Sequence, residues 1–418
     1  MARYAFTAMV AASCLLRAAQ TGMEEYHRVF PGARGFGVLT PAGNNGRIVR
    51  VTNLNGEGPG SLREALSGKG PRLVVFEVGG VIDLQTKAIT IAEPYLTIAG
   101  QTAPSPGITV IKGSILIKTH DVLIRHLRFR LGDAGRPKGG GWETEMATWG
   151  TDAYNIVIDH CSVSWGVQSN LSVAGPQSEG PAGTSHNVTF SNSIVAEGLA
   201  NSAGSRAMGS LVNDGCTNVA MIGNLFASND RGNPYFKANT SGVLLNNLIY
   251  NPGSGAIQLD WLASEWIGHP APHNPRVSVV GNVLYYGPST NEGLALVSRK
   301  GDAYLADNLA FDRSSTPAAI TAGLIEVLAE RTLWPRRLMP LPAAKVQAWV
   351  LQHAGARPRD RDEVDKRIVA DVTERKGRII SSQEEVGGYP RPLPARRRLV
   401  IPPEDLDEWL EKMAAEVE

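Results

Sequence analysis

The stretch Val243-Leu244-Leu245-Asn246-Asn247-Leu248 decides the fold, because its pattern returns along the middle of the chain. Each copy places β-forming apolar residues before a short polar or turn segment and then an apolar residue, and none is long enough for a helix. Successive copies begin 24 to 34 residues apart. The other copies are residues 122–127, 156–161, 188–193, 219–224, 277–282 and 303–308.

Repeats of this kind predict an all-β fold, a right-handed parallel β-helix in which each coil stacks on the next. The alternative of βα units is disfavoured, since no amphipathic helix lies between most of the strands. An Asn after each strand suits a tight turn, and its amide can bond the equivalent Asn one coil on. This predicts a ladder, with its register open by one residue, of Asn192, Asn224, Asn247, Asn282 and Asn308.

The ends of the repeat region have a different composition. Ser61, followed three residues later by Glu64, forms a capping-box pattern that predicts an N-terminal helical cap over residues 61–66. We expect the β-helix to occupy residues 29–315, a C-terminal helical extension residues 316–390, and a basic linker with a terminal helix residues 391–418. Within these last two segments, helices are expected at 317–330, 343–353, 360–375 and 404–418.

Composition excludes several classes of protein. The 418 residues carry 41 Lys and Arg against 40 Asp and Glu, so no basic surface for nucleic acid is expected. No apolar run reaches the length of about 18 residues that a membrane span needs. Residues 1–20 are either a secretory signal or an apolar leader, because Arg17 interrupts the pattern. Three cysteines make no disulfide framework, and Cys161 is expected to be buried.

Several short strings along the chain combine in one order. They are residues 30–37, 51–55, 58–63, 95–104, 158–166, 233–236 and 386–390. These strings resemble, in the same order, those of the pectate lyase family of polysaccharide lyases. The resemblance spans roughly residues 29–390 and implies a parallel β-helix, secretion, and cleavage of an acidic polysaccharide by β-elimination.

The chemistry implied by the resemblance needs a cation and a base. Calcium would neutralise the uronate carboxylate, using oxygen ligands. The family's acidic ligands correspond to Glu143 and Glu145, which alternate and can share one strand face. Gln168 stands where similar members carry an acidic residue, so calcium binding is expected to be weakened or absent. The Asp159-His160 pair matches a family motif and is expected to be structural.

The family's catalytic Arg corresponds in position to Gly232 in this chain. Arg231, one residue earlier, is the candidate base, and Lys237 is the candidate partner for a uronate carboxylate. Arg206 is a weaker candidate for binding substrate. Aromatic faces stack on sugars, which makes Trp261 and Trp266 candidates for the substrate groove, although core packing explains both equally well.

Three functions remain open. The first is a secreted, monomeric polysaccharide lyase acting on pectate, polygalacturonate or a related polyuronate. The second is a carbohydrate-binding β-helix with reduced or lost catalysis. The third is a polygalacturonase-like hydrolase, which is disfavoured because no close group of carboxylates lies at strand spacing.

Overall fold

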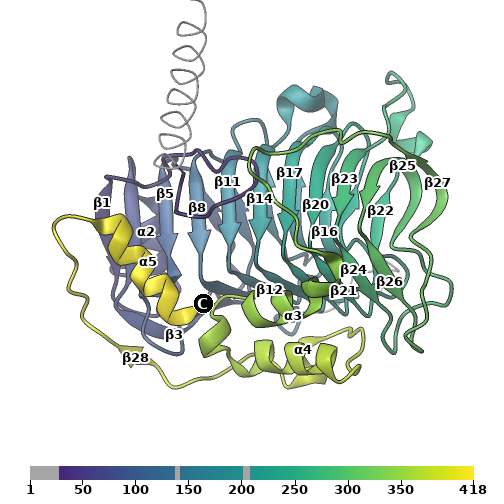
Figure 1. The fold of residues 1–418 in the computed structure, drawn as a ribbon. Helices are drawn as coiled ribbons and strands as arrows, with labels where there is room; N and C mark the ends of the chain where they lie inside the picture. Colours follow the sequence, from purple (N-terminus) through teal and green to yellow (C-terminus); the bar gives the residue numbers. More distant parts are fainter. Residues whose placement is uncertain (1–27, 137–141, 201–207) are drawn as a thin grey trace, which may run out of the picture.

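The structure is a computed structural model, and it describes residues 28–136, 142–200 and 208–418. Its centre is a parallel β-helix whose coils stack along one axis (Figure 1). An 18-stranded sheet contains two stacks of strands, and a 10-stranded sheet contains the third. Neighbouring strands pair in parallel throughout, apart from one antiparallel strand near the C-terminus. The predicted all-β solenoid is confirmed.

The three stacks are best followed strand by strand. The first stack contains β1 (Arg47–Val51), β2 (Arg72–Phe76), β5 (Leu96–Ala99), β8 (Val122–Arg125), β11 (Tyr154–Asp159), β14 (His186–Ser191), β17 (Thr217–Ile222), β20 (Ser241–Leu245) and β23 (Arg276–Val280). The second contains β4 (Ile89–Ile91), β7 (Ile115–Ile117), β10 (Met146–Trp149), β13 (Ser169–Ala174), β16 (Met208–Val212), β19 (Tyr235–Phe236), β22 (Ile257–Leu259) and β27 (Thr321–Val327). β25 (Val297–Ala306) pairs within both stacks. The third contains β3 (Val78–Asp83), β6 (Ile108–Ile111), β9 (Leu127–Arg130), β12 (Ser162–Ser164), β15 (Ile194–Ala196), β18 (Leu225–Ala227), β21 (Leu248–Tyr250), β24 (Val283–Tyr285), β26 (Leu309–Phe311) and the antiparallel β28 (Ala395–Arg396).

Strand alternation divides the apolar residues between an inner and an outer cluster. In β17, Val219 and Met221 belong to the central core, whereas Ala220 and Ile222 pack outside it with Leu338. This is the period of two that a strand requires. The central core runs from Val51 to Ala310 as one continuous cluster.

In the turns after β17, β20 and β23 of the first stack, one residue adopts the left-handed conformation and the next one forms the asparagine ladder. The sequence pattern predicts both roles for a single residue. The asparagine ladder exists, with the amide of Asn224 donating to Asn247 at 3.1 Å, Asn247 to Asn282 at 2.9 Å, and Asn282 to Asn308 at 3.2 Å. The left-handed turn residue, however, is the preceding one. Asn192 has φ 48° and is therefore a turn residue, so its place in the ladder was wrong by one position, which Ser193 occupies.

The N-terminal cap is a short helix, α2 (Leu62–Ser67). Ser61 is its N-cap and accepts a hydrogen bond from the Glu64 backbone, as the capping pattern predicted. Leu62, Ala65 and Leu66 are buried in the central core beside the first coil.

The prediction of a helix over residues 317–330 was wrong. The segment instead forms β27, which pairs in parallel with β25 over seven residues. The open edge of β25 offers backbone partners that outweigh local helix propensity, and Gly323 at φ 83° breaks a helix further. Strand stacking therefore continues beyond residue 315.

The remaining extension carries three helices, joined by irregular segments and the short β28, and returns along the solenoid (Figure 1). α3 (Ala343–His353) and α4 (Glu363–Thr373) pack on the third stack, and α5 (Leu406–Val417) packs on the first coils. Within the described residues, no helix combines the length and the apolar character needed to cross a membrane. The 3-10 turns are η1 (Gly100–Thr102), η2 (Gln177–Gly183), η3 (Ala263–Trp266), η4 (Pro358–Asp360) and η5 (Gln383–Val386).

Candidate functional site

Most of the predicted site residues lie on or beside the outer face of the second stack. Met146 of β10 and Leu171 of β13 point into the core, so the alternating neighbours Glu145 and Ser172 point outward. Phe236 of β19 is likewise a core residue. The stack thus presents candidate side chains in rows parallel to the solenoid axis.

Glu145 is held by two serines of the next strand. Its Oε2 accepts hydrogen bonds from Ser172 Oγ at 2.6 Å and Ser169 Oγ at 3.1 Å. Gln168, the third predicted metal-binding residue, is half-buried directly before β13, while Glu143 is exposed. Oxygen atoms of a kind that calcium accepts therefore gather here, but Glu145 is the single half-buried carboxylate among these residues.

Asn170, which lies within the same segment, is unavailable to a metal. Its Oδ1 accepts from the Gly166 backbone at 2.8 Å, and its amide donates to Ala196 and Asn229. These bonds make it part of the internal structure of the coil. The residues present fit a calcium site of low charge, with Glu145 as its anionic ligand and the neighbouring hydroxyl and amide groups as neutral ones.

Arg231 precedes β19 and forms a backbone bridge to Met208 of β16. Its side chain is half-buried, and its Nε has no hydrogen-bond partner among the described residues. β10 and β19 are three strands apart, so Glu145 and Arg231 are separated by roughly 14 Å along the axis at about 4.8 Å per strand. The two groups can act on one extended chain of sugars rather than directly on each other.

Gly232 explains why no arginine stands at the expected position. It has φ 63°, and a Cβ there would lie 3.0 Å from the Cβ of Met208. Its N–H donates to Gln258 Oε1 at 2.9 Å. The local backbone therefore favours glycine, and the neighbouring residue carries the guanidinium.

Lys237 directly follows β19 and is paired with two carboxylates. Its Nζ lies 3.0 Å from Asp214 Oδ2 and 2.7 Å from Glu265 Oε2. Burial lowers the pKa of Lys237, but the two carboxylates outweigh it and leave the pKa above its usual value. Lys237 stays charged, and a substrate carboxylate would have to compete with Asp214 and Glu265 for it.

The two tryptophans lie in the loop after β22. Trp261 donates its Nε1 to Asn274 at 3.0 Å, and Lys300 Nζ lies 3.8 Å from the centre of its ring. Trp266 ends η3 and packs edge-on against His269. Both rings are half-buried, so a sugar would stack on Trp261 only from the face that Lys300 does not cover.

The remaining predictions fall elsewhere. Arg206 and residues 1–20 lie outside the described residues. Asp159 is buried and accepts hydrogen bonds from His160, Ser191 and Asn192, each at 2.7 to 2.9 Å. Burial raises the pKa of Asp159, but His160 and Arg125 outweigh it and hold the pKa below the usual range. These buried contacts agree with the structural role expected for the pair.

Sequence reasoning missed the partners of these groups. Ser172, Asp214 and Glu265 contact the predicted residues directly, yet each lies 23 to 28 residues from its partner along the chain. That separation is one coil of the repeat. A systematic comparison of residues one coil apart would have found all three.

Comparison with known proteins gives relatives along most of the chain. The chain is 33% identical over 372 residues to a probable pectate lyase C of Aspergillus flavus, covering 86% of this chain and 81% of the relative. It is 32% identical over 376 residues to a probable pectate lyase C of Aspergillus fumigatus, covering 86% and 80%. A scan against family models found no match.

Solved structures with the same fold are more distant in sequence. A cedar-pollen allergen, jun a 1, superimposes with a TM-score of 0.56 at 15% identity, covering 77% of this chain and 92% of the allergen. A pectate lyase bound to a hexasaccharide superimposes with a TM-score of 0.55 at 14% identity, covering 79% and 98%. At these identities the match concerns the fold.

Proposed function

Because the chain belongs to the pectate lyase family, we propose that it is a polysaccharide lyase that cleaves pectate, polygalacturonate or a related polyuronate by β-elimination. The observation that carries the proposal is sequence identity above 30% to the curated relatives over most of both chains. The second stack supports it, because Glu145 lies beside β10, and Arg231 and Lys237 flank β19 three strands further along the same stack.

In this proposal each group has one task. Arg231, whose Nε–H has no hydrogen-bond partner among the described residues, stabilises as a guanidinium the charge that develops beside the uronate carboxylate. It can take the proton from the neighbouring carbon only after it has lost one of its own protons to solvent. Lys237 binds a substrate carboxylate, and Trp261 and Trp266 provide apolar surface for sugar rings. Calcium, when bound near Glu145, would neutralise a uronate carboxylate.

The deciding experiment follows the ultraviolet absorbance of the conjugated double bond that a lyase leaves in its product. Purified protein is incubated with polygalacturonate, alginate and glucuronan, with calcium or with a chelator. We expect absorbance to rise with polygalacturonate. New reducing ends without the absorbance would indicate a hydrolase instead.

A carbohydrate-binding protein with lost catalysis is the second candidate, favoured by Gly232 at the expected position of the base. It predicts retention on immobilised polygalacturonate with no absorbance change.

The calcium concentration that activity requires is a second test of the proposed lyase. A site with one half-buried carboxylate should need calcium at about 10⁻⁴–10⁻³ M, the range of weak extracellular sites.

We further propose that the protein is secreted and acts as a monomer. Residues 1–20 would serve as the signal, in keeping with a substrate found outside cells. Fractionation of an expressing culture tests the first point, and light scattering on the purified protein tests the second.

A further inference from the structure

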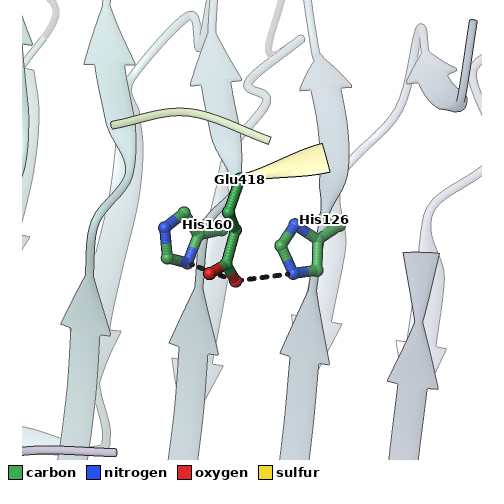
Figure 2. A group of neighbouring side chains, drawn as sticks. All are labelled: His126, His160 and Glu418. Atoms are coloured by element: carbon green, nitrogen blue, oxygen red, sulfur yellow. Dashed lines mark ion pairs between the residues drawn. The ribbon is translucent and has the colours of Figure 1, made fainter. Parts of the chain in front are cut away.

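Three side chains from distant parts of the sequence meet on the side of the solenoid (Figure 2). His126 lies in the turn between β8 and β9, and His160 in the equivalent turn one coil on. Glu418 follows α5, which packs on the coils of β2 and β5 and reaches β8 through the ion pairs of Arg125 with Glu411 and Glu418. One ligand atom from each lies within 4.8 Å of the other two. None of the three belongs to the outer face of the second stack.

His126 has one ring nitrogen that is hydrogen-bonded and one that is not. Its Nδ1 lies 2.8 Å from the carbonyl oxygen of Ala356, and because a carbonyl only accepts, the proton is on Nδ1. In the neutral ring, Nε2 then carries a lone pair. This nitrogen is completely buried, has no hydrogen-bond partner among the described residues, and faces Glu418 Oε1 at 3.4 Å.

Two electron-pair donors that face each other across a gap repel unless a proton or a metal ion lies between them. The separations suit a metal ion. His126 Nε2 and His160 Nδ1 lie 3.4 Å and 3.6 Å from Glu418 Oε1. Ligands at about 2.0–2.2 Å from a tetrahedral zinc ion are about 3.3–3.5 Å apart, so two edges of the coordination shape are already present.

The surrounding charge permits a cation. Arg125 is adjacent, with Nη2 2.9 Å from the same Glu418 oxygen, and would repel an ion. It is itself surrounded by three carboxylates, those of Asp159, Glu411 and Glu418. An oxygen with two lone pairs can accept from Arg125 and bind an ion at once.

For His160 to bind the ion through Nδ1, the proton on Nδ1 must leave through solvent, and the ring stays neutral with its remaining proton on Nε2. Its Nδ1 lies 2.7 Å from Asp159 Oδ2 and donates to it when no metal is bound. Metal binding displaces such protons at histidine ligands generally. Asp159 keeps its hydrogen bonds from Ser191 and Asn192, and its Oδ2 would then lie beside the ion.

We propose that His126, His160 and Glu418 bind one divalent ion of the zinc class, which fastens the C-terminal helix to two successive coils. Two imidazole nitrogens and one carboxylate oxygen favour zinc over calcium or magnesium, which take oxygen ligands. A route from solvent exists, because Glu418 lines a surface cavity together with Gln352 and His353.

The test uses the full chain, stripped of metal with a chelator and titrated with zinc alone. We expect one bound zinc per chain by calorimetry and elemental analysis, and a rise in melting temperature. Cobalt should bind in its place and give the strong visible absorption of a four-coordinate ion.

Two variants separate this site from others. Glu418→Gln removes one ligand from a side chain that is partly exposed, and His160→Asn keeps a residue that tolerates the left-handed turn at φ 44°. Each should weaken zinc binding at least about tenfold. Glu416→Gln, the same change at an exposed position two residues earlier, should leave it unaltered.

Melting curves of the metal-free variants establish that they fold. The proposal is overturned if the wild type binds no zinc, or if both site variants bind zinc as tightly as Glu416→Gln does. Binding at the exposed His269 or His273 would give that second result. Lyase activity is not a readout, so this test is independent of the proposed function.

Discussion

At the scale of single residues, Gly232 links backbone geometry to chemistry. Its left-handed φ and the contact that a Cβ would make with Met208 leave no easy place for a larger residue. The guanidinium of Arg231 is therefore the cation available at this point of the stack. Introducing arginine by Gly232→Arg should strain the turn rather than improve the site.

Arg231→Ala should reduce lyase turnover on polygalacturonate by about 10²–10⁴-fold, the usual contribution of a group that transfers a proton. Arg276→Ala, which removes an exposed arginine at the start of β23, is the matched control and should retain activity. Absorbance assays on both variants, with melting curves to confirm folding, decide the point. Full turnover by Arg231→Ala would remove Arg231 from the mechanism.

The two described cysteines give a prediction about pH. Burial raises the pKa of both Cys161 and Cys216 to about 12, so the folded protein keeps them as thiols where an unfolded chain forms thiolates. In a Cys14→Ser background, iodoacetamide at pH 9 should label neither residue until guanidinium is added. Since the unfolded state loses these protons first, stability should also fall as pH rises from about 9 towards 12.

At the scale of elements, α4 is fastened to the solenoid by buried charges. Arg130 Nη2 lies 2.7 Å from Asp365 Oδ1, and Ser162 Oγ donates to Asp365 Oδ2 at 2.7 Å. Arg130 and Asp365 are completely buried. Removing one partner leaves the other as an uncompensated buried charge. The free energy lost in this way is much larger than the net stabilisation that the intact ion pair provides.

Asp365→Ala should therefore lower the free energy of unfolding by about 3–5 kcal/mol. Glu363→Gln, at an exposed position of the same helix, should change it by less than about 0.5 kcal/mol. Urea denaturation of both variants measures the difference. Equal midpoints would mean that α4 is held by its apolar contacts alone.

Acid should weaken the ion pair between Arg130 and Asp365. Burial raises the pKa of Asp365, but Arg130 and Arg128 outweigh it and hold the pKa below its usual value. The stabilisation is complete above the unfolded pKa of about 4 and is lost as pH falls below it. Wild-type stability should fall in this range more steeply than that of Asp365→Asn, which urea midpoints at several pH values would show.

The elements also show how far sequence reasoning reaches. Helices at 343–353 and 404–418 were predicted correctly in type and approximate extent, because apolar residues recur on one face of each. β27 was not, because its strand partner β25 lies outside the local window. The pairing of Arg130 with Asp365 joins residues 235 positions apart, and no local pattern connects them. In the candidate site, the partners of Glu145 and Lys237 were missed because they lie one coil away.

At the scale of the whole molecule, the solenoid has two unlike ends. α2 buries its apolar residues against the first coil. β27 pairs on one side with β25, and no described strand pairs with its other side. Leu324 and Val327 of this strand are 74% and 60% exposed. An exposed apolar edge of this kind is a template for association with another chain.

Leu324→Lys should therefore reduce self-association at high protein concentration, because a charge on an edge strand opposes pairing. Leu393→Lys is the control, since Leu393 is 88% exposed but lies outside the strands. Light scattering during storage compares the two variants with the wild type. If Leu393→Lys protects equally well, net charge rather than the strand edge governs association.

The buried arginines of β8 and β9 are synthesised long before the C-terminal carboxylates that pair with them. A ribosome emits Arg130 232 residues before Asp362, so these early coils exist for most of translation with their cations uncovered. A nascent chain halted before α4 and α5 would expose the arginines of β8 and β9 on the side of the solenoid. These exposed positive charges would attract anionic surfaces and chaperones. The arginines of β8 and β9 therefore gain their C-terminal carboxylate partners only after α4 and α5 have been synthesised.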